Sequence, residues 1–332
     1  MLVLTFCRRL TALAILCGVA ACSDQATGAG GFAPPTISQS GKHLTSCPCL
    51  YVPNFFGDSI TVYKAGAHGN RAPIQNISGT YTDLRGPQAV AVDASANIYV
   101  TNEDGNIITI YHAGATGNIP PSRYISGNST QLRSPYGIAV NPVNGNIYVV
   151  NYMQAAIWIF SAASNGNAAP TASIQGSKTG LLEPLGLAFD SAGNLFVADY
   201  QSNAVLMYSA GSTGNVAPAR TIQSDVLVSP TQVALDSRNN VYVSCYLYSG
   251  FVLVFAAGAN GNATPLQDIS GPKTKMSQAS GIAVDASRNI YVSITMEAIA
   301  EYATAATGNV APIHQLKGSY TGLNDPQEIA IR

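Results

Sequence analysis

One segment of about 48 residues returns six times along this chain of 332 residues, and this repeat constrains the fold more than any single motif does. Each copy carries a Gly-Asn pair, and successive pairs are 48, 49, 48, 47 and 47 residues apart, with glycines at Gly69, Gly117, Gly166, Gly214, Gly261 and Gly308. So constant a period indicates equal structural units that pack against their neighbours in the chain.

Each unit has the composition of four short strands. In one copy, Ile138–Val140, Ile147–Val150 and Ile157–Phe160 are rich in the β-branched and aromatic residues that strands favour. Turn-forming residues separate these blocks, and a shorter fourth block follows, such as Arg220–Ile222. The apolar residues do not recur at helical spacing for long enough to form a helix. Four strands in about 48 residues are the size of one β-propeller blade, so we predict an all-β fold.

The two ends of the chain predict a closed ring. The first copy begins at Leu50–Val52, which aligns with the second strand of the other copies. The last segment, Pro326–Ile331, aligns with the first strand and has nothing after it. The C-terminal strand is therefore expected to complete the N-terminal blade, which leaves no free edge. We predict a six-bladed propeller of four-stranded antiparallel blades over residues 47–332.

The repeat resembles NHL repeats. The motifs behind this resemblance are Pro-x-Gly-Ile-Ala-Val-Asp, Gly-Asn-Ile-Tyr-Val and an Ile-x-Val-Tyr-type strand, and they recur over nearly the whole chain after residue 50. The resemblance implies a six-bladed propeller. It does not imply one function, since the fold carries lyases, lactonases, RNA-binding proteins and scaffolds.

The N-terminus is typical of an exported protein. Residues 1–21 place Arg8 and Arg9 before a short apolar run that ends at Val19-Ala20-Ala21-Cys22, and we predict a signal peptide there. The last four residues resemble the bacterial lipoprotein cleavage box, which implies that Cys22 is lipidated. The alternative is ordinary cleavage beside an incidental cysteine. Ser23 favours, by analogy with lipoproteins, an outer-membrane or cell-surface location, with the lipid as the only membrane contact.

Residues 22–46 are poor in large apolar side chains, so we predict a flexible tether. Three cysteines follow Cys22. Cys47 and Cys49 are close enough in sequence to form only a small, strained ring, and we expect Cys245 to be a free, half-buried thiol.

Composition excludes one class of partner. Charged residues make up 10% of the chain and the net charge is −1, so there is no basic surface for nucleic acid. We expect a monomer without a cofactor, whose partner is an envelope protein, a peptide or a glycan.

The predicted binding site is the propeller face formed by two sets of loops, which join strand two to strand three and strand four to the next blade. Tyrosine rings among amides often bind sugars, peptides or proteins. The alternative is that these rings only pack over the blade ends. The candidate ligand-binding residues are Phe55, Phe56, Tyr136, Tyr152, Tyr200, Tyr246, Gln88, Gln232 and Gln327.

An oxygen-lined channel mouth is a second possibility. Asn and Asp recur after the second strand, where they either hold Ca²⁺ or Mg²⁺ or, as repetition in every blade favours, cap backbone amides. The metal ligands in this alternative are Asn102, Asn151, Asp199 and Glu328. Of the four histidines, His43 lies in the tether, and His68, His112 and His314 are expected away from the mouth.

Three functions are compatible with these features. The first is a non-enzymatic binding propeller at the cell envelope. The second is a metal-dependent hydrolase or lyase, similar to a lactonase, with its site at the channel mouth. The third is a structural spacer without a ligand.

Overall fold

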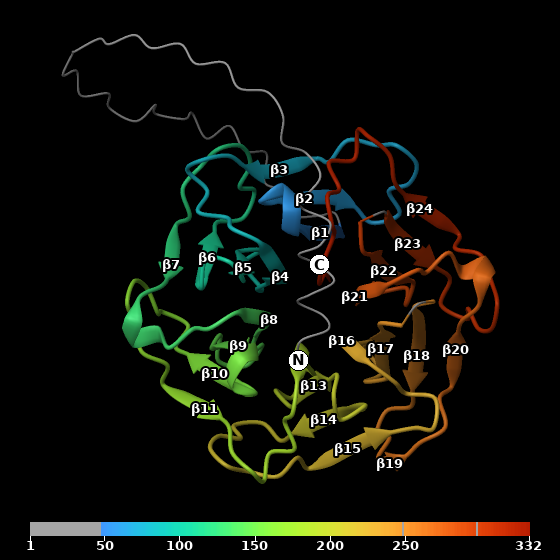
Figure 1. Ribbon diagram of the computed structural model, residues 1–332. Coiled ribbons are helices and arrows are strands. Elements are labelled where there is room, and N and C mark those ends of the chain that lie inside the picture. Colours follow the sequence, from blue (N-terminus) through green and yellow to red (C-terminus); the bar gives the residue numbers. More distant parts are fainter. Residues whose placement is uncertain (1–47, 248, 297) are drawn as a thin grey trace, which may run out of the picture. The chain divides into compact units, whose positions relative to one another are not determined.

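The protein is described by a computed structural model that covers residues 48–247, 249–296 and 298–332. The predicted signal peptide, the lipidation site Cys22, the tether and Cys47 lie outside the described residues, as do Tyr248 and Glu297. In the described part the strands form six sheets arranged in a ring, which confirms the six-bladed β-propeller (Figure 1).

The first three blades come from the two ends and the first half of the chain. Each contains four antiparallel strands, given from the channel outward. They are β25 (Ala330–Ile331), β1 (Cys49–Asn54), β2 (Ser59–Lys64) and β3 (Gln75–Ser78) in blade one; β4 (Pro87–Val92), β5 (Ile98–Asn102), β6 (Ile107–Tyr111) and β7 (Arg123–Ile125) in blade two; and β8 (Pro135–Val140), β9 (Ile147–Asn151), β10 (Ala156–Phe160) and β11 (Ala172–Ile174) in blade three.

The other three blades follow in order around the ring. They are β12 (Pro184–Phe189), β13 (Leu195–Asp199), β14 (Ala204–Tyr208) and β15 (Arg220–Gln223) in blade four, to which β19 (Gly261–Asn262) adds a fifth strand; β16 (Pro230–Leu235), β17 (Val241–Cys245), β18 (Phe251–Phe255) and β20 (Gln267–Ile269) in blade five; and β21 (Ala279–Val284), β22 (Ile290–Ile294), β23 (Ala298–Tyr302) and β24 (His314–Leu316) in blade six. The only helical segments among the described residues are the 3-10 turns η1 (Phe55–Gly57), η2 (Asn128–Thr130), η3 (Tyr152–Gln154) and η4 (Pro272–Thr274).

The ring closes as the ends of the sequence predict. β25 pairs antiparallel with β1, with Leu50 opposite Ile331 and Tyr51 opposite Ala330. The backbones of Cys49 and Arg332 exchange two hydrogen bonds, of 2.6 and 3.0 Å, beyond this pair. The C-terminal strand therefore completes the N-terminal blade, and the two ends meet in one sheet (Figure 1).

The repeated Gly-Asn pair joins neighbouring blades. In blade two, Gly117 forms a parallel bridge to Ile77 in the last strand of blade one, and the Asn118 side chain accepts the N–H of Tyr81 at 2.8 Å. The sequence predicted a simple turn here. The structure shows a clamp that also covers the outer edge of the preceding sheet, where an unpaired edge strand would invite aggregation.

A second tie repeats inside the blades. The third strand of four blades carries, at or next to its end, a buried tyrosine whose hydroxyl donates to the carbonyl of a threonine in the loop entering the same blade. The pairs are Tyr63–Thr321, Tyr111–Thr82, Tyr208–Thr179 and Tyr302–Thr274. Phe160 and Phe255 occupy this position in blades three and five, fully buried and without the hydroxyl.

The core lies between the blades, and the innermost strands approach closely around the channel. A Cβ on Gly137 would lie 2.2 Å from the carbonyl oxygen of Leu185, and one on Gly186 would lie 2.6 Å from the Cα of Gln232. The glycine of the Pro-x-Gly motif is therefore required by contact between inner strands. In the predicted hairpin turns, Asp190 accepts the N–H groups of Ala192 and Asn194, as expected of a turn former.

Cys245 corrects one prediction. It is free, as expected, but it is fully buried rather than half-buried, because it ends β17 inside the core between blades four and five. Burial raises the pKa of the Cys245 thiol, so it does not behave as a reactive thiolate. Within the described part of the chain, no helix has the length and apolarity to cross a lipid bilayer.

Candidate functional site

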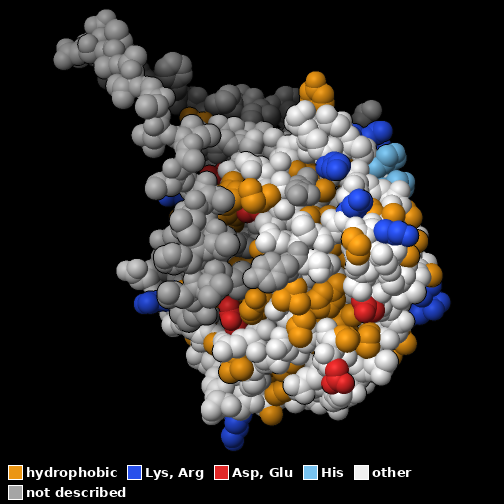
Figure 2. All heavy atoms as spheres, turned by 45° about the vertical axis from the view of Figure 1, so that its right-hand side comes forward, with side chains coloured by type: hydrophobic (Ala, Val, Ile, Leu, Met, Phe, Trp, Pro, Cys, Tyr) orange, Lys and Arg blue, Asp and Glu red, His pale blue; other side chains and the backbone are white. Residues whose placement is uncertain are grey.

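The loop face comprises the loops from the second to the third strand of each blade and from the fourth strand into the next blade. It exposes most of the large apolar side chains that the described residues leave in solvent. Thirteen such side chains are exposed, and eight of them lie in these loops: Phe56, Tyr81, Met153, Leu182, Val226, Leu247, Met296 and Tyr320. Hydrophobic side chains gather near the middle of the face seen in Figure 2, with acidic side chains beside them and most of the visible lysine or arginine side chains nearer the edge.

The structure brings two of the predicted aromatic residues together. Tyr136, in β8, and Tyr152, in η3, place their ring centroids 5.7 Å apart. The Tyr152 hydroxyl donates a 2.6 Å hydrogen bond to the Glu183 carboxylate, which belongs to the loop entering blade four. This bond links blades three and four at the loop face and fixes the orientation of the Tyr152 ring.

The surroundings of this pair are electronegative. Burial raises the pKa of Tyr152, and the hydrogen bond and charge of Glu183 raise it further, with smaller contributions from Tyr136 and Glu103. Tyr152 therefore stays a neutral hydrogen-bonding phenol at physiological pH. A neutral ring held by a carboxylate suits recognition, since it offers apolar area with a polar tip.

The other predicted rim aromatics lie on other blades, although the N–H of Tyr200 donates to the Glu183 carbonyl at 2.9 Å. Phe55 and Phe56 contact each other edge to face at 5.3 Å in η1 of blade one. Tyr200 and Tyr246 directly follow β13 and β17, and both are partly buried. The predicted rim aromatics thus do reach the loop face, but as local groups on different blades.

The predicted glutamines lie in the channel and not on the rim. Gln88, Gln232 and Gln327 are buried on the innermost strands or the segment leading into β25. Gln88 donates to the side-chain oxygen of Gln327 at 3.3 Å, and Gln232 accepts the Ile282 N–H at 2.6 Å. These bonds join neighbouring blades, one with two and five with six.

Glu328 is the chemically distinctive group of the channel. It is 2% exposed, and its Oε1 has no hydrogen-bond partner among the described residues. Desolvation by burial raises the pKa of Glu328 well above its ordinary value. The nearby Gln88 also has a buried, unpartnered Oε1.

Three residues of the metal alternative accept hydrogen bonds from backbone N–H groups. Asn102 accepts the N–H of Arg85, Asn151 accepts that of Arg133, and Asp199 accepts those of Leu182 and Glu183. Each side chain caps the loop that enters its own blade. Among the described residues, no group of three His, Cys, Asp or Glu side chains is placed to hold a metal. The hydrogen bonds of Asn102, Asn151 and Asp199 agree with the capping role, and the Ca²⁺ or Mg²⁺ alternative stays a prediction.

Sequence reasoning did not single out one further concavity. A pocket of about 240 Å³ lies beside blade two. Its walls come from the loop entering the blade, from the loop before β6 and from β7, so residues far apart in one repeat line it. They are Asp83, Arg85, Gly105, Ile107, Tyr124 and Ser126.

The fold resembles known structures, although no protein-family model matches the chain and no curated protein matches its sequence. A chain in the crystal structure of a nidogen/laminin complex aligns with TM-score 0.60 and 13% identity, covering 86% of this chain and 98% of that one. A protein of unknown function from Bacteroides caccae aligns with TM-score 0.58 and 11% identity, covering 86% and 99%. A Lactobacillus plantarum protein aligns with TM-score 0.56 and 15% identity, covering 82% and 83%. These likenesses support the β-propeller fold, and the narrower NHL assignment stays a prediction.

Proposed function

We propose that this protein is a non-enzymatic binding propeller whose loop face holds an envelope protein, a peptide or a glycan. The observation that carries this proposal is the concentration of exposed apolar side chains on the loop face, eight of the thirteen in the described chain. Exposed apolar area of this kind marks interaction sites on soluble domains. The Tyr152–Glu183 bond adds a rigid aromatic anchor, and an anchor that is fixed before binding loses little entropy on binding.

The proposed setting is the bacterial cell envelope. The sequence supports this placement through its signal-like N-terminus and the lipoprotein-type Cys22. A lipid on Cys22 and a tether of residues 22–46 would hold the propeller near the membrane and let the loop face reach a partner.

The proposal is tested with the full chain immobilised and screened against envelope extracts, peptides and glycans. A ligand retained by the wild type should be lost by the Tyr152→Ala/Tyr200→Ala double variant. Leu266→Ala is the control, since Leu266 is an exposed apolar residue between β19 and β20, outside the loop face. Circular dichroism and the melting temperature confirm folding of each variant. Retention by the double variant would contradict the proposal, and a wild type that retains nothing would favour a spacer.

A second candidate function rests on Glu328. Buried carboxyl groups with raised pKa are frequent among general acids in enzymes, which favours the hydrolase or lyase alternative. Turnover of lactones or esters that disappears in Glu328→Gln would support it. Equal turnover in the variant would exclude Glu328 as the acid.

A further inference from the structure

The seam between blades six and one differs from the other seams at one position. The residue before the clamp glycine is Thr116, Asn165, Asn260 or Thr307 in four other copies. Each of these side chains accepts a backbone N–H from the last strand of the preceding blade, that of Asn76, Tyr124, Thr221 or Asp268. In the seam that closes the ring, His68 takes this position and stacks on the His314 ring instead.

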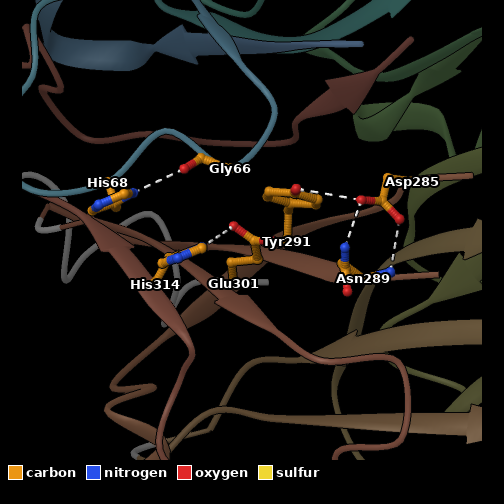
Figure 3. A network of polar contacts seen from close by, with 7 residues as sticks. All are labelled: Gly66, His68, Asp285, Asn289, Tyr291, Glu301 and His314. Atoms are coloured by element: carbon orange, nitrogen blue, oxygen red, sulfur yellow. Dashed lines mark hydrogen bonds and ion pairs between the residues drawn. The ribbon is translucent and has the colours of Figure 1, made fainter. Parts of the chain in front are cut away.

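The two imidazoles form an ordered pair (Figure 3). The rings of His68, between β2 and β3, and His314, in β24, are 9° from parallel, with centroids 4.5 Å apart. Nδ1 of His68 lies 3.0 Å from the carbonyl oxygen of Gly66. Nδ1 of His314 lies 2.9 Å from Oε2 of Glu301, a buried carboxylate on β23.

These contacts determine which nitrogen of each ring carries the proton and which keeps its lone pair. Both acceptors are oxygens, so each imidazole is held as the tautomer that carries its proton on Nδ1. The lone pair is then on Nε2 in both rings. Histidines that bind metals typically have this arrangement, in which the other ring nitrogen donates to a carboxylate or a backbone carbonyl.

We propose that Nε2 of His68 and Nε2 of His314 bind one divalent transition-metal ion across the closing seam. Imidazole nitrogen suits Zn²⁺, Cu²⁺ and Ni²⁺, whereas Ca²⁺ and Mg²⁺ prefer oxygen ligands. Metal–imidazole bonds are about 2.0–2.1 Å long, so two nitrogens on one ion are roughly 3–4 Å apart. A metal ion lies in the plane of each imidazole that it binds, so the two stacked rings must turn until both Nε2 lone pairs point at the same ion. His68 is exposed, which leaves its ring room to turn and water room to complete the coordination.

At this location the ion would stabilise the contact between blade six and blade one. His68 directly precedes Gly69, which bridges to Leu316 and holds blade one against blade six. The ion would link residues from the two ends of the chain at the seam that joins blade six to blade one. Binding to the closed ring alone would raise its stability with metal concentration.

The test uses the full chain without a polyhistidine tag. Calorimetric titration with Zn²⁺ should show one ion per chain, and the melting temperature should rise with Zn²⁺ concentration. Cu²⁺ bound to the protein should give an electron paramagnetic resonance spectrum with two coordinated imidazole nitrogens. Glu301→Gln should weaken Zn²⁺ binding by about 10–100-fold, as removal of an outer-shell partner generally does.

The chain supplies its own matched variant. His68→Thr introduces the residue found at the equivalent seams, so it should keep the metal-free melting temperature while losing Zn²⁺ binding. His314→Gln should lose binding as well, and His112→Gln, an exposed histidine of blade two, should keep it. The proposal is overturned if the wild type binds no Zn²⁺, or if His68→Thr binds it as the wild type does.

Discussion

Replacing Glu328 by glutamine tests whether the channel holds a neutral carboxyl group. The residue is 2% exposed, and burial raises its pKa well above the ordinary value. Above the ordinary carboxyl pKa the unfolded chain releases this proton, whereas the folded protein keeps it until the raised folded pKa is reached. The folded state thus binds more protons in this window, so the free energy of unfolding falls as pH rises. The slope from one such group approaches 1.4 kcal/mol per pH unit.

Glu328→Gln removes this slope, because glutamine has a similar shape and does not ionise. Urea denaturation should be measured from pH 5 to pH 8 and followed by the fluorescence of Trp158, the only tryptophan and a buried one. The difference in unfolding free energy, variant minus wild type, should increase with pH by up to about 1.4 kcal/mol per unit and level off above the folded pKa. A poorly placed amide shifts this difference by a constant and leaves the slope intact.

The control is Asp104→Asn, which removes an exposed carboxylate from the loop face. It should give a difference that varies little over the same range. If Glu328→Gln is equally flat, the Glu328 carboxyl is solvated or paired in solution, and our description of the channel is wrong.

Three further substitutions test the packing of the blades by chemical denaturation. Tyr208→Phe should lower the free energy of unfolding by about 0.5–1.5 kcal/mol, because the Thr179 carbonyl loses its donor. No change would mean that the hydroxyl is dispensable, as it is in the two blades that have phenylalanine at this position. Gly137→Ala should cost about 1–3 kcal/mol or more through overlap with the Leu185 carbonyl, and a neutral effect would show that the inner strands can separate. Asn118→Ala should cost about 0.5–1.5 kcal/mol at the clamp between blades one and two, with unchanged stability arguing that water replaces its bond to Tyr81.

The fold could be predicted because each copy of the repeat has the same pattern of strand-forming and turn-forming residues. The missing first strand at Leu50 and the extra one at Pro326 were enough to predict the closure, which the pairing of β1 with β25 confirms. The side-chain environment was harder to predict. Gln88 and Gln327 were expected on the rim from their place beside loops, but the short inner strands bury them in the channel. Strand alternation does not reveal which inner-strand side chains meet across a ring.

Side chains that depart from the repeat are the ones that carry distinctive chemistry. The position after Pro-x on the inner strands holds Ala89, Gly137, Gly186 and Gly281 in four blades, but Gln232 and Glu328 in the other two. The glycines allow the inner strands to approach closely, whereas Gln232 and Glu328 place long polar side chains there.

The same reasoning applies to the closing seam. His68 and His314 are 246 residues apart in the sequence and share no motif, so only the ring brings them together. A repeat alignment shows His68 as a departure from Thr or Asn, yet it cannot show the partner. In a closed repeat protein, the role of a residue that departs from the consensus therefore becomes clear only when the residues of the neighbouring blade that it contacts are known. The blade next to the first one is the last.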